Sequence, residues 1–440
     1  MPKTSFVTLD LTAPANLGQA LGRHQGQVIF VPGGLPGERV RVRLVEERKR
    51  WSRGELVELQ TSSPDRVEPP CPYYGLCGGC HWQHAAYPAQ LAYKQAVVEE
   101  QLRRLARIKA PPVQPTLASP PSTGADREDE PLPAGPWFYR NHAQFAAGPA
   151  GRMQDQHAGA SLGFAAAGSQ DVVPIERCLL LHPLLDEMYG LLDLDWPELT
   201  RLSLRAGIHT GERLVIFEAY DDEIPELEVD VPMSCVFRQR DGTDLTLIGS
   251  GVYHEILSGR RYRVSAASFF QVNTAQAETM LDVVRTYLDP RPSDALLDLY
   301  SGVGVIGLSL AEHVDQVIGV EEHPTAVLDA DLNAADLAPK SGVEWIQGPA
   351  EAVLPQLEAE VDKVVLDPPR SGCKPQVVQA LLRLSPERIV YVSCEPTTLA
   401  RDGALLIEGG YHLLEVQPLD MFPQTYHVET VSLWQRREVK

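Results

Sequence analysis

The stretch Leu299-Tyr-Ser-Gly302-Val-Gly304-Val-Ile-Gly307 follows a short apolar run and opens a segment with helical periodicity. Glycines at a strand-to-helix turn let the backbone approach a ligand closely. Glu321 ends the next apolar run, where a carboxylate can accept both hydroxyls of a ribose. Read literally, Gly302-x-Gly304-x-x-Gly307 is the dinucleotide-binding pattern, so an NAD-type oxidoreductase is one hypothesis for this part of the chain.

Residues 263–440 alternate apolar runs with helical segments, which predicts an α/β fold with a doubly wound, parallel sheet. The predicted strands lie at 295–300, 317–321, 344–347, 363–367 and 388–393, with a closing pair at 411–417 and 428–435. In open sheets of this kind ligands bind at the carboxyl ends of the strands. Side chains that follow these runs directly are therefore candidates for the chemistry.

Two later stretches end neighbouring predicted strands with reactive side chains. Val364-Val-Leu-Asp367-Pro-Pro-Arg370 places a carboxylate on a stiff proline turn, and Ile389-Val-Tyr-Val-Ser-Cys394-Glu-Pro396 places a lone thiol. An isolated cysteine is more often structural, but an acidic-Pro-Pro turn is typical of the substrate side of methyltransferases on this fold. A nicotinamide enzyme has no use for that turn, so the pair favours methyl transfer over hydride transfer.

The first 62 residues predict a small β-barrel. Valine and leucine alternate with Arg39, Arg41 and Arg43, which puts apolar groups on one face of a strand and cations on the other. Such a face could bind RNA or could be an ordinary solvated surface. The net charge of −20 argues against non-specific coating of nucleic acid, although it leaves room for a local basic groove.

Three cysteines within ten residues, Cys71-x5-Cys77-x2-Cys80, indicate a metal site in a predicted segment 63–110, which ends in a helix. The total of seven cysteines is odd and the chain begins without a signal-peptide pattern, so metal or catalytic roles are favoured over disulfides. The candidates for a fourth thiolate are Cys178, Cys235 and Cys373, of which Cys178 is preferred. Four thiolates suit zinc or an iron–sulfur cluster, and the spacing does not choose between them.

Between these parts lie a proline-rich linker, predicted at 111–136, and a mixed, mostly β central domain, predicted at 137–262. No apolar run reaches the roughly 20 residues that span a bilayer, so no membrane partner is expected. The absence of an export pattern predicts a cytoplasmic protein.

With these motifs in place, the chain resembles the RNA (uracil-5-)-methyltransferases, in the branch with a TRAM domain and an iron–sulfur cluster. The run Gly26-x-Val28 to Val40 is similar to the TRAM domain, an RNA-binding barrel of the OB type. The other shared motifs are Ser268-Phe-Phe-Gln271-Val-Asn273, Asp298-Leu-Tyr300-Ser-Gly302-x-Gly304, Asp367-Pro-Pro-Arg370, Ser393-Cys394-x-Pro396 and Asp420-Met-Phe-Pro423-x-Thr425-x-His427-Val-Glu429.

The resemblance implies a Rossmann-like, S-adenosylmethionine-dependent methyltransferase domain at 263–440. It implies that the cofactor site is lined by Gln271, Tyr300, Glu321 and Asp367. It also implies that a 4Fe–4S cluster is held by Cys71, Cys77, Cys80 and Cys178.

The reaction implied is methylation of uridine C5 through addition of the Cys394 thiolate to C6, with Glu429 removing the C5 proton. The branch that the chain resembles implies 23S rRNA as the substrate, with a tRNA T-loop uridine as the alternative. The expected partner is therefore RNA. The protein is expected to be a monomer. A non-catalytic RNA-binding protein is a third hypothesis. Three positions depart from the family's usual residues, namely Glu395, Val305 and Pro349.

Overall fold

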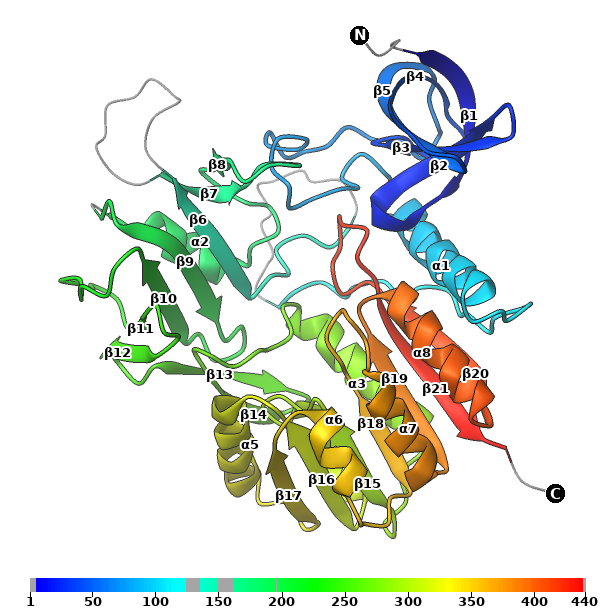
Figure 1. Ribbon diagram of the computed structural model, residues 1–440. Helices are drawn as coiled ribbons and strands as arrows, with labels where there is room; N and C mark the ends of the chain where they lie inside the picture. The colour runs from blue at the N-terminus through cyan, green and yellow to red at the C-terminus, as the bar shows by residue number, and fades with distance from the viewer. Residues whose placement is uncertain (1–4, 124–134, 149–160, 195, 438–440) are drawn as a thin grey trace.

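The computed structural model describes residues 5–123, 135–148, 161–194 and 196–437. A small closed barrel at the N-terminus, a central sheet and a C-terminal sheet flanked by helices follow one another along the chain (Figure 1). No helix in the described part of the chain combines the length and apolar character needed to cross a membrane. The domain boundaries drawn from the sequence remain predictions.

The N-terminal barrel closes in the strand order β1-β2-β3-β5-β4. Its strands are β1 (Phe6–Pro14), β2 (Gln19–His24), β3 (Gln27–Pro32), β4 (Arg39–Glu47) and β5 (Trp51–Thr61), with a short helix η1 (Asn16–Gly18). Strand β4 alternates as predicted, because Val40 and Val42 are buried in the barrel while the arginines between them face solvent.

The arginines of β4 do not form an unpaired cationic surface. Arg39 lies 3.1 Å from the Asp10 carboxylate on the neighbouring strand. The carboxylates of Glu58 and Glu55 on β5 pair in the same way with the next two exposed arginines of β4. Exposed pairs of this kind contribute little to stability, but they neutralise the strand locally. The hypothesis of a basic RNA-binding face on β4 therefore loses its main support.

The predicted linker is partly docked. After α1 (Tyr87–Arg104), the chain runs along the outer edge of β20 (Tyr411–Leu419), where Val113 bridges Val416 and Leu117 bridges Leu419. Residues 112–117 are therefore bound to the C-terminal sheet and cover its edge, which an isolated strand would leave unpaired. Residues 124–134 of the predicted linker lie outside the described residues.

The central sheet has seven strands in the order β12-β11-β10-β9-β6-β7-β8. They are β6 (His142–Gly148), β7 (Ser161–Ala165), β8 (Val172–Pro174), β9 (Leu199–Ala206), β10 (Arg213–Ala219), β11 (Ser234–Arg238) and β12 (Asp244–Ile248). Helix α2 (Pro183–Gly190) packs against β9. The core on this side includes Phe145 and Phe237, both fully buried.

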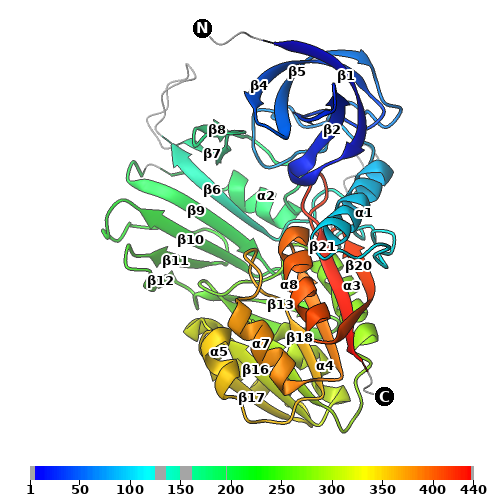
Figure 2. The same ribbon diagram turned by 45° about the vertical axis from the view of Figure 1, so that its right-hand side comes forward.

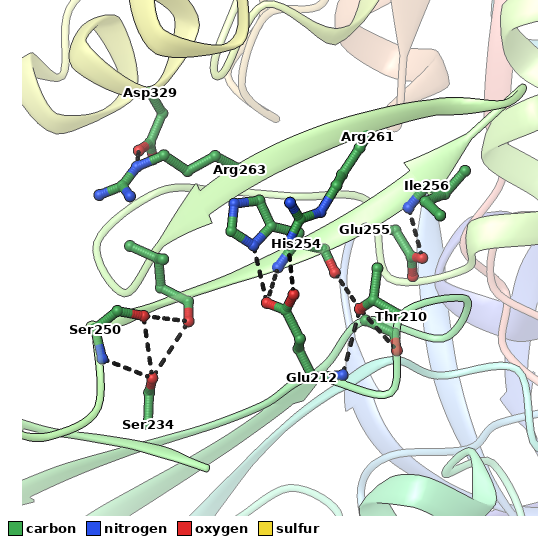
Figure 3. A network of polar contacts seen from close by, with 12 residues as sticks. Thr210, Glu212, Ser234, Ser250, His254, Glu255, Ile256, Arg261, Arg263 and Asp329 are labelled. Atoms are coloured by element: carbon green, nitrogen blue, oxygen red, sulfur yellow. Dashed lines mark hydrogen bonds and ion pairs between the residues drawn. The ribbon is translucent and has the colours of Figure 1, made fainter. Parts of the chain in front are cut away.

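A hairpin, β13 (Val252–Leu257) and β14 (Arg260–Ser265), joins the central sheet to the C-terminal sheet. Figure 3 shows its polar contacts: Glu212 at the start of β10 accepts hydrogen bonds from His254 and Arg261, at 2.9 and 2.8 Å. On the other side Arg263 donates a hydrogen bond to Asp329 of the helix α5 (Pro324–Leu337) at 2.9 Å. The hairpin thus fixes one sheet relative to the other.

The C-terminal sheet is ordered β17-β16-β15-β18-β19-β21-β20. Its remaining strands are β15 (Ala295–Leu299), β16 (Gln316–Glu321), β17 (Gly342–Gln347), β18 (Lys363–Leu366), β19 (Arg388–Ser393) and β21 (Glu429–Arg436). The helices are α3 (Thr274–Leu288), α4 (Val305–Leu310), η2 (Ala311–His313), α5 (Pro324–Leu337), α6 (Ala350–Val353), η3 (Leu354–Gln356), α7 (Pro375–Leu384) and α8 (Pro396–Glu408). The strands predicted here are all present, and helices cover both faces of the sheet (Figure 2).

Strand β19 shows why this sheet reads as continuous apolar runs. Val390 and Val392 belong to the core beneath α3, whereas Ile389 and Tyr391 belong to the core beneath α7 and α8. A strand covered on both faces is apolar at every position. The strand order reverses between β15 and β18, and ligands bind at such a switch point, beyond the carboxyl ends of the strands.

Candidate active site

The glycine-rich loop lies at the carboxyl end of β15. Gly304, with φ +83°, starts α4, and a side chain there would meet the Trp345 ring of β17 at 2.8 Å. Glu321, at the end of β16, accepts hydrogen bonds from the backbone of Gly302 at 2.9 Å and of His323 at 2.8 Å. The carboxylate predicted to bind ribose therefore also fixes the loops on both sides of it.

A second carboxylate lies beneath the same loop. Asp298 is almost completely buried, and its Oδ2 accepts a hydrogen bond from the backbone of Gly307 at 2.8 Å. Burial raises the pKa of Asp298 to about 7, although the Gly307 bond acts against this. Its Oδ1 has no hydrogen-bond partner among the described residues. No role is predicted for Asp298 from the sequence, although it begins one of the shared motifs.

Asp367 and Gln271 meet at the switch point. Asp367 directly follows β18, and burial raises its pKa to about 7. Gln271 Nε2 lies 3.4 Å from Asp367 Oδ2, as a weak hydrogen bond. Asn141 of the central part donates to the backbone oxygen of Gln271 at 2.9 Å, so the loop that carries Gln271 is held from outside the sheet.

The same loop is also anchored on α5. Ser268, three residues before Gln271, donates its hydroxyl hydrogen to Asp329 at 2.7 Å. Asp329 is fully buried and accepts further hydrogen bonds from Ser265 and Arg263. This arrangement ties the Gln271 loop to the helix that follows Glu321.

Cys394 and Glu429 come together because β21 runs antiparallel to β19. Thr430 pairs with Ser393, and its hydroxyl donates to the Ser393 carbonyl at 2.9 Å. Glu429 and Cys394 are the next residues outward on these two chains, so the thiol and the carboxyl group lie at the same end of the sheet as Asp367.

The surroundings of Cys394 and Glu429 disfavour the thiolate and the carboxylate. Burial raises the pKa of the Cys394 thiol to about 12, and the negative charges of Glu429 and Asp367 add to the effect. Burial, with Asp367 nearby, also raises the pKa of Glu429 well above the ordinary range. Arg370 opposes both shifts, since its positive charge favours the thiolate and the carboxylate.

Arg370 is the functional candidate that the sequence analysis missed. Its positive charge favours the Cys394 thiolate, and its backbone oxygen accepts a hydrogen bond from Thr398 of α8 at 3.2 Å. The signal was present, since Arg370 completes the Asp367-Pro-Pro-Arg370 motif. The two prolines between Asp367 and Arg370 restrict the backbone and so limit the direction in which the Arg370 side chain can point.

Comparison with known proteins agrees with this geometry. A family profile described as tRNA (Uracil-5-)-methyltransferase matches residues 256–347 and 354–437, and a TRAM profile matches residues 5–57. An uncharacterized RNA methyltransferase of Gloeobacter violaceus is 35% identical, covering 98% of this chain and 96% of that protein. One of Streptomyces avermitilis is 38% identical, covering 95% of each.

The chain belongs to the RNA (uracil-5-)-methyltransferase family. Among solved structures, the tRNA (uracil-54, C5)-methyltransferase of Pyrococcus abyssi in complex with S-adenosyl-L-homocysteine matches with a TM-score of 0.70 and 26% identity, covering 97% of this chain and all of that one. Membership makes this protein an S-adenosylmethionine-dependent RNA methyltransferase with a TRAM domain, and it removes the reason for the hydride-transfer hypothesis.

Not all of the predicted site residues of this methyltransferase lie together. Gln271, Asp367, Cys394 and Glu429 gather at the carboxyl ends of β18 and β19. Tyr300, with φ +60°, instead packs against the core that contains Cys373, and burial raises its pKa. A cofactor contact of Tyr300 stays a prediction.

The departure at position 395 has a local structural role. Glu395 is the N-cap of α8, and its carboxylate accepts a hydrogen bond from the backbone of Thr397 at 3.1 Å. An asparagine would cap the helix in the same way. Glu395 therefore maintains the turn that presents Cys394.

The four cysteines predicted to hold a cluster line one cavity of about 810 Å³ between the barrel and the central sheet. The loop that carries Cys77 is fixed there, because the backbone of Gly78 donates to the Ala165 oxygen at 2.9 Å. Within the part of the chain that the structure describes, no three cysteine, histidine or acidic side chains converge as the ligands of a single metal ion do. A metal at this cavity remains a prediction.

The raised pKa of Cys394 predicts slow alkylation of the RNA-free enzyme. With a pKa of about 12, only about one thiol in ten thousand is ionised at pH 8. Iodoacetamide labelling of Cys394, followed by peptide mass spectrometry, should therefore accelerate about tenfold per pH unit up to about pH 10 without levelling off. A plateau below pH 9 would contradict a protonated resting thiol. Asp367→Asn, which removes one nearby negative charge, should accelerate labelling.

Proposed function

We propose that this protein methylates C5 of a uridine in 23S rRNA, giving 5-methyluridine. One observation carries the proposal. The Cys394 thiol follows the end of β19, and the Glu429 carboxyl group lies at the adjacent start of β21, beside Asp367 and Arg370. The thiol can supply the nucleophile that adds to a pyrimidine ring, and the carboxyl group can supply the base that later removes the C5 proton.

The reaction begins with Cys394. Uracil C5 is a poor nucleophile because the ring carbonyls withdraw its electrons. Addition of the Cys394 thiolate to C6 turns the ring into an enolate with charge on C5, and Arg370 favours the thiolate form that must attack. S-adenosylmethionine, when bound, supplies an electrophilic methyl group that C5 can attack.

Glu429 completes the reaction. After methylation C5 carries both a hydrogen and the new methyl group, and the Glu429 carboxylate takes that proton. The electrons of the C5–H bond re-form the C5–C6 double bond, and the C6–S bond breaks to release Cys394. A buried base with a raised pKa holds the proton more strongly than an exposed glutamate does.

The cofactor would be held by groups around the switch point. Glu321 has a carboxylate at the position where such sheets bind ribose hydroxyls, and the loop at Gly304 leaves the backbone close to any ligand. Gln271 and Asp367 lie between that loop and Cys394. These residues fit a nucleoside that extends from the loop toward the thiol.

A methyl-transfer assay tests the reaction and the RNA together. Labelled S-adenosylmethionine is incubated with anaerobically purified protein and either unmodified 23S rRNA or unmodified tRNA, and the product nucleoside is identified by mass. We expect 5-methyluridine in rRNA alone. The tRNA alternative is supported by the match to the Pyrococcus abyssi enzyme, and 5-methyluridine in tRNA alone would establish it instead. Binding of RNA without methylation of either would favour the non-catalytic hypothesis.

We further propose that the cysteine cavity holds a 4Fe–4S cluster through Cys71, Cys77, Cys80 and Cys178. Each iron of such a cluster takes one thiolate, so the four thiols surround the cluster instead of converging on one ion. Four thiols around a common cavity fit such a cluster, and zinc is the alternative. We also expect a monomer that works in the cytoplasm.

Iron analysis tests the cluster. Anaerobically purified protein should contain about four iron and four sulfide per chain and absorb visible light. Cys178→Ser should lower the iron content, whereas the control Cys235→Ser, in the core of the central sheet, should not. One zinc per chain without iron would contradict the cluster.

A further inference from the structure

The loop 420–428 joins β20 to β21 and delivers Glu429 to the site. It is held by residues from other parts of the chain. Asn273 donates to the Met421 oxygen at 3.3 Å, and the Tyr139 hydroxyl donates to the Pro423 oxygen at 3.1 Å. Lys94 of α1, fully buried, pairs with Asp420 and donates to the Phe422 oxygen at 3.1 Å. The position of Glu429 is therefore set by contacts outside its own strand.

Gln424 is the most constrained residue of this loop. Its φ is +67°, a left-handed conformation that glycine adopts easily and a glutamine only under local constraint. Its side-chain oxygen accepts from Gln90 Nε2 at 2.9 Å, and its backbone nitrogen donates to Gln90 Oε1 at 3.1 Å. The side chain is almost completely buried, so water does not compete for these bonds.

The cysteine segment, residues 71–84, binds the same residue from the other side. The backbone nitrogens of His81 and Trp82 both donate to the backbone oxygen of Gln424 at 3.0 Å. The His81 ring lies 4.4 Å from the Tyr426 ring and 6.1 Å from the His427 ring, measured between centroids. His81 directly follows Cys80. The segment that carries the predicted metal ligands therefore contacts the loop as far as His427, two residues before Glu429.

We propose that Gln424 is a positioning residue through which the cysteine segment and α1 hold Glu429 in place to remove the C5 proton. This inference rests on the proposed function and adds a role for the cysteine segment in the second half of the reaction. Cys394 does not depend on this loop, because β19 and the Glu395 cap of α8 present it. Gln424→Ala keeps the backbone bonds to His81 and Trp82 but removes the side-chain bond to Gln90 that holds the left-handed turn. It should therefore slow proton removal much more than methyl transfer.

Single-turnover kinetics of Gln424→Ala separate the two steps. The variant is mixed with labelled S-adenosylmethionine and unmodified 23S rRNA, or tRNA if that is the RNA methylated. Methyl incorporation and release of the RNA from the protein are then followed on denaturing gels. We expect incorporation within about twofold of the wild type, release slowed at least about tenfold, and accumulation of a methylated covalent RNA–protein species.

The matched control is Gln417→Ala. Gln417 lies on β20 close to the same loop, and its amide donates to the backbone oxygens of Pro115 and Pro418. It should leave both steps unchanged. Equal slowing of incorporation and release in Gln424→Ala, or unchanged release, would overturn the inference. Failure of the wild type to methylate any RNA would instead overturn the proposed function, and the inference with it.

Amide hydrogen exchange tests, in the absence of the reaction, whether the contact between Gln90 and Gln424 holds the loop before Glu429 in place. In Gln90→Leu the side-chain partner of Gln424 is lost at a position on α1 that is far in sequence from Glu429. Mass spectrometry of the folded, RNA-free protein should show at least about tenfold faster exchange of amides 425–429 than in wild type or Gln417→Ala. Exchange at the wild-type rate would contradict the proposed link. Binding of S-adenosylmethionine by Gln90→Leu, measured by calorimetry, would confirm that the variant retains its fold.

Discussion

Cys394→Ala is expected to lower methyl transfer by at least about 10⁴-fold, because without the thiolate C5 of uracil gains no charge. Alanine removes only the sulfur from a half-buried turn that β19 and α8 fix independently, so the fold should persist. Turnover is measured with labelled S-adenosylmethionine, and cofactor binding by calorimetry. Binding should remain within about threefold of the wild type, because none of the predicted cofactor residues changes.

The control for this variant is Cys373→Ala, which removes another buried thiol near the same sheet. Cys373 contacts Tyr300 and Tyr391 on the face away from Glu429, so its loss should leave most of the activity. Substantial methylation by Cys394→Ala would eliminate the covalent mechanism, while loss of cofactor binding would indicate a structural role for the thiol.

Glu429→Gln is expected to stop the reaction after methyl transfer. The amide cannot accept the C5 proton, so the bond between Cys394 and C6 persists, and product release should slow by about 10³-fold. Denaturing gels should show a stable RNA–protein species that carries the labelled methyl group. Glutamine has nearly the same shape and removes a buried carboxyl group whose pKa is raised by burial and Asp367, so stability should not fall.

The matched control is Glu344→Gln, on the exposed surface of the edge strand β17, which should behave as the wild type. In the wild type, release should accelerate as the pH rises, because the raised pKa keeps Glu429 protonated beyond the ordinary range of a glutamate. If Glu429→Gln turned over at the wild-type rate and formed no covalent RNA–protein species, another group would be the base that removes the C5 proton.

The strands were predictable because the parallel sheet is buried on both faces, and Ile389 to Val392 are all apolar for that reason. The glycines of the loop after β15 marked its strand-to-helix turn, where Gly304 has a positive φ. Asp367 and Cys394 could be placed near one another because parallel strands end at a common edge. The paired arginines of β4 could not be foreseen, since Glu55 and Glu58 lie on a different strand whose register the pattern does not reveal.

By itself the sequence determined which side chains stand at strand ends, because strand periodicity and turn residues are local properties. The tertiary structure alone decided that β21 runs against β19 and brings Glu429 to Cys394. It also decided that Arg370 opposes the raised pKa values of Cys394 and Glu429, and that Gln424 is held by a residue more than three hundred positions earlier. Pairing direction and long-range contacts depend on how distant segments pack, and no local pattern encodes them.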